Sequence, residues 1–453
     1  MIRADELTAS LGALLRQQVG EAPRGFRAVR IDSREVQPGD LFVALPGEHH
    51  DGHDFLSDAV ARGAHGLLAQ RPPTAPLPGV VTYVVNDTLQ ALQRVAGEHR
   101  RRLPVKVIGV TGSVGKTTTK EMTASVLRRH YRVLKNEANF NNEIGLPLTL
   151  LQLSARHERA VLEMGMYAPG EIRSLCELAR PEVGVVTNVG PVHLERLGSI
   201  EAIAAAKAEL VEALPKEGAA VLNGDDPLVK AMAAKTRARV LLYGTSADCE
   251  VRGVDLDSHG LRGIAFTMIC ERRRVRVKTR LPGRHLLYNA LAAAAVGLLE
   301  GMTPDELAEA LARARVPLRL RVYRGRNDST ILDDTYNASP ASMLAALELL
   351  ADLPGRRIAV LGDMRELGSE EREGHRMVGR EAAQVAQVIY AIGELGHLIG
   401  EEARRAGHPA VSLWSSKEEA ARHLAENLAV GDVVLLKGSR AMALETMLKE
   451  LKG

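Results

Sequence analysis

The chain has 453 residues, which gives room for about three domains of ordinary size. Its apolar content of 45% and charged content of 25% are typical of a globular protein. A net charge of +3 is too small to favour a nucleic-acid or membrane surface, and the most apolar stretch, 286–299, is too short to span a bilayer. The start of the chain shows no secretory leader, and the three cysteines are widely spaced without a CxxC motif. We therefore expect buried free thiols, no membrane insertion and a cytoplasmic location.

Two breaks in composition divide the chain. The first, His99–Pro104, is basic and ends in proline, and the second, 313–325, is a basic passage after an alanine-rich helix. The predicted domains are residues 1–103, 104–317 and 318–453. We expect the arginine cluster inside the first break to belong to a solvated linker; it consists of Arg100, Arg101 and Arg102.

The segment Val107–Thr119 reads VIGVTGSVGKTTT, a β-branched run followed by glycines, a lysine and three threonines. This pattern predicts a strand, a phosphate-binding loop and a helix over 120–129. Backbone N–H groups of such a loop point at phosphate oxygens, while Lys116 supplies a positive charge and the Thr117 hydroxyl a ligand for Mg²⁺. The loop is shorter than GxxxxGK[ST], because Val110 stands where the first glycine belongs. An ordinary glycine-rich turn is the alternative, but Gly-Lys-Thr between a strand and a helix favours nucleotide binding.

Short apolar runs alternate with helical patterns in the central and C-terminal segments, which predicts βαβ units and mainly parallel sheets. The predicted strands are 105–110, 160–164, 183–187, 219–222 and 240–243, then 331–333, 357–361, 388–392 and 433–436. Ligands of such sheets gather at the carboxyl ends of the strands. Polar motifs that follow these runs directly are therefore site candidates: 112–117, Glu163, 188–193, 334–337, 362–366 and 437–440.

Three single residues have competing interpretations. Glu163 ends an apolar strand, and a Mg²⁺ ligand is favoured over a solvated acid because the phosphate loop needs a metal partner. His193 lies in a loop shaped by glycine and proline, and structural and catalytic roles are equally open. Lys207 lies on an alanine-rich helix and, taken alone, is typical of a surface lysine with a partly covered stem.

Several loops are rich in amide, hydroxyl and carboxylate groups. Asn139–Pro147 and Asp333–Pro340 could bind phosphate, sugar or metal-bound water, or could simply make Asx turns. The N-terminal segment offers Asp32–Arg34 and Asp51–Phe55 in the same way. Taken one at a time, these loops leave both interpretations open.

Together the motifs resemble those of the Mur ligases, the ATP-dependent amide-forming enzymes of peptidoglycan assembly. The shared features are a TGxxGKTTT loop, a glutamate on the next strand, a histidine loop, a lysine helix, an asparagine-bearing helix and a basic linker. They occur in the family's order and cover essentially the whole chain. The resemblance is greatest to the members that join D-Ala-D-Ala to UDP-N-acetylmuramoyl-tripeptide. The discriminating segments are 115–122, 139–149, 333–340, 362–368 and 437–440.

The resemblance implies an α/β fold with three domains. These are an N-terminal uridine-nucleotide-binding domain, a central P-loop-type ATPase domain with a mainly parallel sheet, and a C-terminal Rossmann-like domain that binds the incoming dipeptide and part of ATP. It also implies ATP and Mg²⁺ as cofactors, with two metal ions, and a carbamylated Lys207. The two substrates would be the only partners of a monomer that binds no nucleic acid.

Roles follow for individual residues from the same resemblance. Catalytic roles fall on Lys116, His193, Lys207 and Arg319, with Arg321 as the alternative linker residue. The nucleotide would be bound by Gly112, Ser113, Val114, Gly115, Lys116, Thr117, Thr118, Asn289, Arg319, Asp334 and Asn337. The metal ions would be held by Thr117, Glu163, His193 and Lys207. The substrates would be bound by Ser33, Arg34, Asn139, Asn141, Asn142, Tyr336, Glu366, Lys437, Ser439 and Arg440.

Three other functions compete with this one. A folylpoly-γ-glutamate ligase shares the loop and the reaction type but lacks a separate uridine-nucleotide domain. An ATPase or GTPase switch without ligation leaves residues 1–103 unexplained. A nucleotide-binding partner without catalysis is disfavoured because Lys116, Thr117 and Glu163 are all present.

Overall fold

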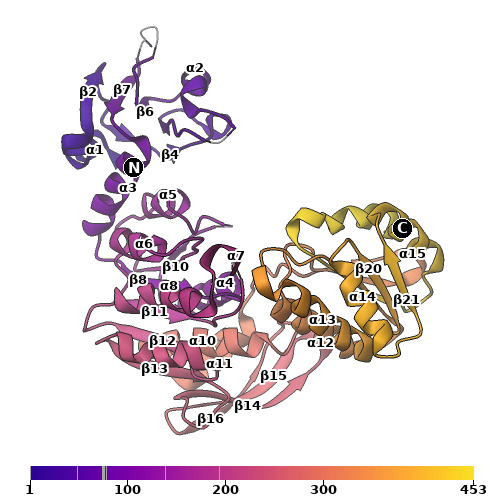
Figure 1. The fold of residues 1–453 in the computed structure, drawn as a ribbon. Coiled ribbons are helices and arrows are strands. Elements are labelled where there is room, and N and C mark those ends of the chain that lie inside the picture. The colour runs from indigo at the N-terminus through magenta and orange to yellow at the C-terminus, as the bar shows by residue number, and fades with distance from the viewer. Residues whose placement is uncertain are drawn as a thin grey trace. The chain divides into compact units, whose positions relative to one another are not determined.

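The computed structural model describes residues 2–47, 49–73, 77, 79–137, 139–192 and 194–452. The chain divides into two compact units. The first consists of Met1–Gly109, His130–Met166 and Gly170–Glu182, and the second of Val110–Arg129, Tyr167–Pro169 and Val183–Gly453. Each unit contains helices and largely parallel sheets (Figure 1). The predicted α/β fold class is thereby confirmed, whereas the three domain boundaries stay a prediction.

The N-terminal sheet has five strands in the order β2-β7-β6-β5-β4. All neighbours are parallel except β2, which runs antiparallel to β7. Its strands are β2 (Leu15–Val19), β4 (Val29–Arg30), β5 (Leu41–Val43), β6 (Gly66–Ala69) and β7 (Val81–Val85). A separate pair joins β1 (Ile2–Arg3) to β3 (Gly25–Phe26). The helices of this segment are α1 (Ala4–Leu11), α2 (Leu56–Ala61) and α3 (Thr88–Arg101).

The expectation of a solvated linker was wrong for Arg100, whereas Arg101 and Arg102 are exposed. Helix α3 runs through Arg101, and Arg100 is buried. The Arg100 guanidinium donates to the carbonyls of Ala179 and Leu103, both at 2.9 Å. Because α3 also packs against α5 (Gly145–Leu150) and α6 (Glu171–Ala179), its apolar face is covered inside the first unit.

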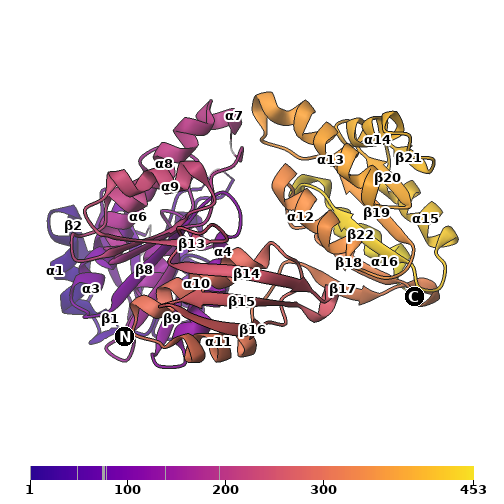
Figure 2. The same ribbon diagram turned by 90° about the horizontal axis from the view of Figure 1, so that it is seen from below.

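The largest sheet has nine strands in the order β16-β15-β14-β13-β12-β11-β8-β10-β9. The strands that sequence patterns predicted are present within a residue or two: β8 (Lys106–Thr111), β10 (Arg159–Glu163), β11 (Val183–Val186), β12 (Ala219–Asn223) and β13 (Arg239–Gly244). The patterns missed four others: β9 (Val133–Lys135), β14 (Val251–Ser258), β15 (Ile264–Cys270) and β16 (Arg273–Lys278). The last three pair as an antiparallel meander with no α-helix between them, so they fall outside the βαβ pattern on which the prediction rested (Figure 2).

Helices accompany this sheet along its length. They are α4 (Lys116–Leu127), α5, α6, α7 (Leu194–Leu197), α8 (Ile200–Glu212), α9 (Pro227–Ala231), α10 (Leu286–Leu299) and α11 (Pro304–Arg313). Helix α10 is the apolar stretch noted in the sequence, and it packs against α4, β12 and β13. Across the described residues, no helix is long and apolar enough to cross a membrane. Cys176, Cys249 and Cys270 are all buried and free, as predicted.

The C-terminal sheet has six strands in the order β17-β18-β22-β19-β20-β21. Sequence patterns predicted β18 (Thr330–Asp333), β19 (Arg357–Gly362), β20 (Val388–Ile392) and β22 (Val433–Lys437). They missed β17 (Arg321–Arg324), which lies within the predicted basic linker, and β21 (Val411–Trp414). Strand β17 is antiparallel to β18, and the remaining pairs are parallel.

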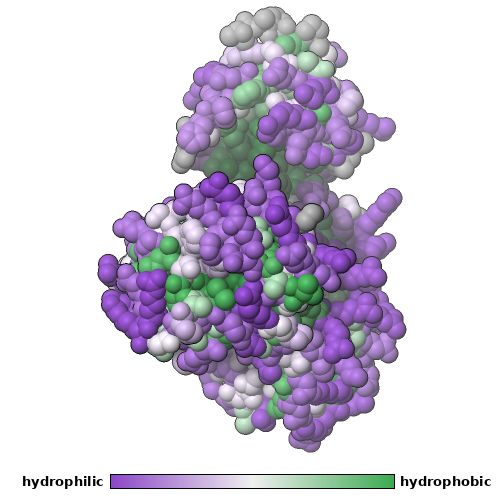
Figure 3. Space-filling view, turned by 90° about the vertical axis from the view of Figure 1, so that its right-hand side faces the viewer, coloured by the Kyte–Doolittle hydropathy of each residue, from purple (hydrophilic) through white to green (hydrophobic). Residues whose placement is uncertain are grey.

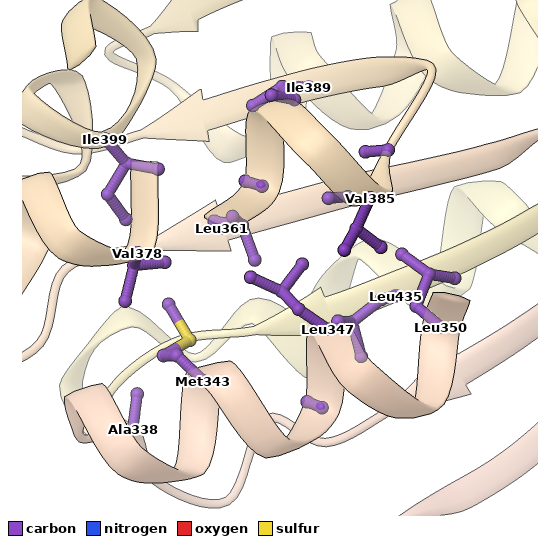
Figure 4. Close-up of a cluster of buried hydrophobic side chains, with 14 of the residues drawn as sticks. Ala338, Met343, Leu347, Leu350, Leu361, Val378, Val385, Ile389, Ile399 and Leu435 are labelled. Atoms are coloured by element: carbon purple, nitrogen blue, oxygen red, sulfur yellow. The ribbon is translucent and has the colours of Figure 1, made fainter. Parts of the chain in front are cut away.

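Apolar side chains cover both faces of the C-terminal sheet. One cluster joins β19, β20 and β22 to α12 (Pro340–Ala351), α13 (Glu371–Val385) and α14 (Gly396–Arg405) (Figure 4). In Figure 4, Met343, Leu347 and Leu350 of α12 face Leu361 and Leu435 of the strands. The second cluster lies against α15 (Lys417–Asn427) and α16 (Leu448–Leu451). The face drawn in Figure 3 is mainly hydrophilic, with apolar residues in a few small groups.

Candidate active site

The loop between β8 and α4 is a tight turn whose two glycines have positive φ. The angle is 144° at Gly112 and 86° at Gly115. A Cβ atom on Gly112 would lie 1.9 Å from the hydroxyl oxygen of Thr187, and one on Gly115 would lie 2.8 Å from the amide nitrogen of Asn289. Both positions therefore require glycine, and the backbone of the loop can approach a ligand closely.

Asn188, two residues after the end of β11, holds this loop in place. Its side-chain oxygen accepts from the Val114 N–H at 2.8 Å, and its amide donates to the Val114 carbonyl at 2.9 Å. Its backbone carbonyl accepts from the Ser113 N–H at 2.9 Å, while the Ser113 hydroxyl is bonded to Gly190. The loop is thus shaped before a ligand arrives, which lowers the entropic cost of binding. Asn188 belongs to the predicted motif 188–193 but was predicted to have no role of its own, although an asparagine just after a parallel strand was a usable signal.

Helix α4 begins at Lys116, four residues before the predicted start, with Gly115 as its left-handed N-cap. Because the first N–H groups of a helix have no acceptor within it, the first turn of α4 is a suitable place for an anion. The Lys116 ammonium donates to the carbonyls of Gly112 at 2.8 Å and Ser113 at 3.2 Å. A positive charge and a helix N-terminus therefore meet at the loop.

The predicted nucleotide residue Asn289 comes from α10 to the same loop. Its amide nitrogen donates to the Gly115 carbonyl at 3.1 Å and to the Thr119 hydroxyl at 2.8 Å. The residue is buried. Because these bonds use both amide protons, any contact between Asn289 and a base would use the side-chain oxygen.

Arg319 also reaches the loop, from the segment between α11 and β17. Its Nη2 donates to the Thr117 hydroxyl at 3.2 Å, and its guanidinium carbon lies 3.8 Å from the ring centroid of Tyr336. The alternative linker residue, Arg321, lies instead on strand β17, opposite Asp333. The geometry therefore brings Arg319, and not Arg321, to the phosphate loop.

Lys207 in α8 is a buried lysine, so its interpretation as a surface lysine was wrong. It is 2% exposed. Burial lowers the pKa of its ammonium well below the usual value, and the nearby charge of Lys116 lowers it further. The surrounding alanines gave no sign of this, because small apolar neighbours fit a surface helix and a buried one equally well. A lowered pKa raises the fraction of a lysine that is a neutral, nucleophilic amine at a given pH.

In the first unit, Glu163 ends β10 with its side chain almost fully buried. Its Oε1 accepts from the Asn141 amide at 2.8 Å. Its backbone N–H donates to Asn136 at 2.9 Å, and its backbone carbonyl accepts from the Asn136 amide at 3.0 Å. The predicted substrate residue Asn141 is therefore brought to Glu163, while Asn142 bonds the N–H groups at the start of α5 and Asn139 is exposed.

The donor groups fit a hard divalent cation. The Oε2 atom of Glu163 is buried and has no hydrogen-bond partner among the described residues, which leaves one carboxylate oxygen for a metal. His193 lies outside the described residues. Within the described ranges, no three His, Cys, Asp or Glu side chains gather as a metal cluster. A Mg²⁺ site needs few protein ligands, because waters and phosphate oxygens complete its shell.

The C-terminal candidates lie at the carboxyl ends of β18, β19 and β22. The buried Lys437 ammonium bonds the Asp334 carboxylate and, at 3.1 Å, the Asn337 carbonyl. The Ser439 hydroxyl accepts from the Arg365 N–H at 2.8 Å. Lys437 and Ser439 thus shape neighbouring loops, whereas Tyr336 and two further candidates are exposed, namely Glu366 and Arg440.

The N-terminal candidates follow β4. Asp32 caps a short 3₁₀ turn by accepting from the Arg34 N–H at 2.9 Å and also pairs with the Arg34 guanidinium. Ser33 is buried beneath this turn, while Arg34 is exposed. The structure brings these residues together within the first unit.

A network around Asp225 was missed by the sequence analysis. Its Oδ2 accepts from the Thr245 N–H at 2.6 Å, the Thr245 hydroxyl at 2.7 Å and the Tyr288 hydroxyl at 3.0 Å. Burial opposes ionisation, but these bonds and those from Ser246 lower the pKa of Asp225 to about 2. Because Tyr288 precedes Asn289, the network fixes the end of α10 that meets the phosphate loop. The Asp225-Asp226 pair after β12 was the available signal.

A pinched glycine loop between a parallel strand and a helix, with lysine and threonine at the helix N-terminus, defines an α/β protein of the P-loop nucleotide-binding class. Three family descriptions match the chain: "Mur ligase family, catalytic domain" over residues 26–108, "Mur ligase middle domain" over 110–297, and "Mur ligase, glutamate ligase domain" over 318–440. The chain belongs to the Mur ligase family.

Individual relatives cover nearly the whole chain. The UDP-N-acetylmuramoyl-tripeptide–D-alanyl-D-alanine ligase of Bacillus subtilis is 38% identical, over 94% of this chain and 93% of its own. A crystal structure of MurF from Acinetobacter baumannii superimposes with a TM-score of 0.89 at 29% identity, over 99% and 98% of the two chains. The structure of MurF from Thermotoga maritima in complex with ADP superimposes with a TM-score of 0.82 at 32% identity, over 94% of this chain and 96% of its own.

Proposed function

We propose that this chain is the ADP-forming ligase that joins D-Ala-D-Ala to UDP-N-acetylmuramoyl-tripeptide during peptidoglycan precursor synthesis. The observation that carries the proposal is the phosphate loop, in which Gly112 has a positive φ, Asn188 bonds the Val114 N–H and the Lys116 ammonium lies at the N-terminus of α4. Relatives with 37% and 38% identity over 94% of the chain bear the name of that ligase.

The reaction is an activation followed by an acyl transfer. The terminal carboxylate of the tripeptide attacks the γ-phosphorus of ATP, so that an acyl phosphate forms and ADP leaves. The amine of D-Ala-D-Ala then attacks the acyl carbon, an amide forms with loss of a proton, and inorganic phosphate leaves. Because the first step brings two anions together, positive charge must be present, and Lys116 and Arg319 supply it.

Mg²⁺ would be held by Thr117, Glu163 and His193, with a second ion near Lys207, and would neutralise phosphate charge. Lys207 would carry a carbamate. Carbamylation joins the neutral amine to CO₂ and releases a proton, and the burial that lowers the pKa of Lys207 supplies the neutral amine. The product is a carboxylate, which is the kind of ligand that Mg²⁺ prefers.

The other predicted residues take binding roles in the same proposal. The uridine nucleotide would be bound around Ser33 and Arg34, the muramoyl peptide by Asn139–Asn142, and the ribose by Asp334. We place the enzyme in the cytoplasm because ATP is present there and the three buried thiols are free. The domains would be 1–103, 104–317 and 318–453, acting as a monomer.

The test is a ligation assay on the purified chain. With ATP, Mg²⁺ and UDP-N-acetylmuramoyl-tripeptide, phosphate release should require D-Ala-D-Ala, and the pentapeptide product should be seen by mass spectrometry. Free D-alanine and glutamate should not replace the dipeptide. Phosphate release without any amine acceptor would instead support an ATPase switch, and ligation of glutamate would support a folylpolyglutamate-type ligase.

The control is a variant of the phosphate loop. Lys116→Ala should lower turnover by on the order of 100-fold or more, because one charge-stabilising group of the transition state is lost. Lys235→Ala, which removes a surface lysine paired with Glu212, should keep normal turnover. Near-normal ligation by Lys116→Ala would contradict the proposed role of the loop.

A further inference from the structure

The contact between Arg319 and Tyr336 joins two distant parts of the second unit. Arg319 lies in the exposed segment between α11 and β17, and Tyr336 lies in the loop after β18. The guanidinium carbon is 3.8 Å from the ring centroid, while its Nη2 donates to the Thr117 hydroxyl at 3.2 Å. One side chain is therefore held by an aromatic face and by the phosphate loop at once.

The loop that carries the Tyr336 ring is held on both sides of the ring. The buried Lys437 ammonium bonds Asp334 and Asn337, the residues that flank the Thr335–Tyr336 pair. The Asp333 carboxylate accepts from the Thr335 hydroxyl at 2.6 Å. The Tyr336 side chain remains 45% exposed, and its hydroxyl has no protein partner in the described part of the chain. The ring face, and not the hydroxyl, is thus the part of Tyr336 that the structure uses.

Stacking on a ring uses only the face of a guanidinium group. The N–H donors lie in the guanidinium plane, so they stay available for an oxygen acceptor while the ring restricts the flexible stem. An exposed arginine without such a partner would have to lose its rotamer freedom when it met a phosphate group.

We propose that Tyr336 is a positioning residue for Arg319, which it holds ready beside the phosphate loop for the γ-phosphate of ATP. The inference rests on the proposed function and goes beyond it, because it makes recognition of the γ-phosphate depend on the loop after β18. It differs from the substrate contact that the family resemblance implied for Tyr336.

Equilibrium binding tests the inference without turnover. Titration calorimetry would compare ADP with adenylyl imidodiphosphate, a non-hydrolysable ATP analogue, both with Mg²⁺. Tyr336→Leu should weaken the ATP analogue about threefold. It should leave ADP binding unchanged, because ADP lacks the γ-phosphate. Tyr336→Phe keeps the ring and should bind both nucleotides like the parent chain.

Making the Tyr336 substitution in a chain that lacks Arg319 distinguishes positioning of Arg319 from a general effect on the loop. In an Arg319→Leu chain, Tyr336→Leu should cause no further loss, because the group it positions is gone. Tyr323→Leu is the matched control. Tyr323 lies on β17, and its ring centroid is 3.2 Å from the Lys452 ammonium nitrogen, so this variant should leave both nucleotide affinities unchanged. Thermal unfolding would verify that all variants are folded.

Three results would overturn the inference: equal weakening of both nucleotides, a loss that persists without Arg319, or a raised KM for D-Ala-D-Ala in Tyr336→Phe. A raised KM for D-Ala-D-Ala would instead support the substrate contact that the family resemblance implied for Tyr336. These outcomes are distinct from failure of the proposed function, which would show as absence of pentapeptide product in the parent chain.

Discussion

Three lysines in the described part of the second unit are buried, and two of them, Lys120 and Lys437, lie beside a carboxylate. Lys120 in α4 is fully buried, and its ammonium lies 3.1 Å from the Glu121 carboxylate. Lys207 has no carboxylate partner among the described residues, and the positive charge of Lys116 acts on it. Because a buried charge without a counter-charge is costly, Lys207 is the one whose pKa is lowered.

The low pKa of Lys207 should be visible in the pH dependence of stability. Between its folded-state pKa and its ordinary value of 10.5, the unfolded chain holds a proton on Lys207 that the folded chain does not. The free energy of unfolding should therefore rise with pH in that window, with a contribution of at most about 1.4 kcal/mol per pH unit. Lys207→Met should remove this part of the slope, as measured by urea unfolding from pH 7 to 10 in CO₂-free buffer.

The matched control for that measurement is Lys235→Met. This variant makes the same change at a surface lysine paired with Glu212, so its slope should follow the parent chain. If Lys207→Met and Lys235→Met gave the same slope as the parent, Lys207 would be charged when folded. The neutral amine required for carbamylation would then be lacking.

At the scale of elements, the C-terminal end of α3 carries two adjacent arginines with different surroundings. Arg100 is buried and satisfies two backbone carbonyls, whereas Arg101, the next residue, is exposed and pairs with Glu98. Burial lowers the pKa of the Arg100 guanidinium, which remains charged all the same because an arginine pKa starts above 12. The two neighbours therefore offer a matched comparison on one helix.

Replacing Arg100 should destabilise the fold, whereas replacing Arg101 should not. Arg100→Met leaves the carbonyls of Ala179 and Leu103 without their donor, which should cost about 1–3 kcal/mol in the free energy of unfolding. Arg101→Met removes one surface ion pair and should change it by less than about 1 kcal/mol. Chemical denaturation measures both, and equal effects would show that the Arg100 contacts are not formed in solution.

The strands that sequence patterns predicted share one property. Strands such as β8, β10, β11 and β12 have neighbours on both sides, so they carry continuous apolar runs. Four of the missed strands, β9, β16, β17 and β21, lie at sheet edges, where one side is unpaired and charged side chains are accepted. Strands β14 and β15 are interior, and they were missed because no helix separates them from their neighbours.

Part of the candidate site could likewise be predicted from the sequence, and part could not. The phosphate loop could be predicted because its glycines, lysine and threonines are contiguous and their chemistry is local. The contacts of Asn188, Asn289 and Arg319 with that loop depend on chain segments more than 70 residues away, which no local pattern contains. Burial of Lys207 is a property of what packs on α8, so the family resemblance could indicate its role while its own helix could not.

At the scale of the whole molecule, the residues after the predicted boundary at 317/318 form apolar clusters almost entirely with one another. Both apolar clusters of the C-terminal sheet consist of buried residues between 331 and 451. Among the described residues outside 318–453, one partly buried side chain, that of Leu261, packs against these clusters. At the predicted boundary 103/104, residues from the two sides pack against each other. Helix α3 packs against α5 and α6, and the Arg100 guanidinium donates to the Ala179 carbonyl.

The two boundaries should therefore behave differently when the chain is cut there. A fragment of residues 318–453 should fold alone, with dispersed NMR signals and a cooperative thermal transition, because it keeps almost all of its buried apolar contacts and has the size of an ordinary domain. A fragment of residues 1–103 should unfold with a broader transition, because cutting there exposes the apolar face of α3 and leaves the buried Arg100 charge without an acceptor at Ala179. Adding residues 104–182 to it should restore cooperativity. A 318–453 fragment that is compact but lacks a cooperative transition would mean that the C-terminal sheet needs the rest of the chain to fold, and the boundary at 317/318 would have to be given up.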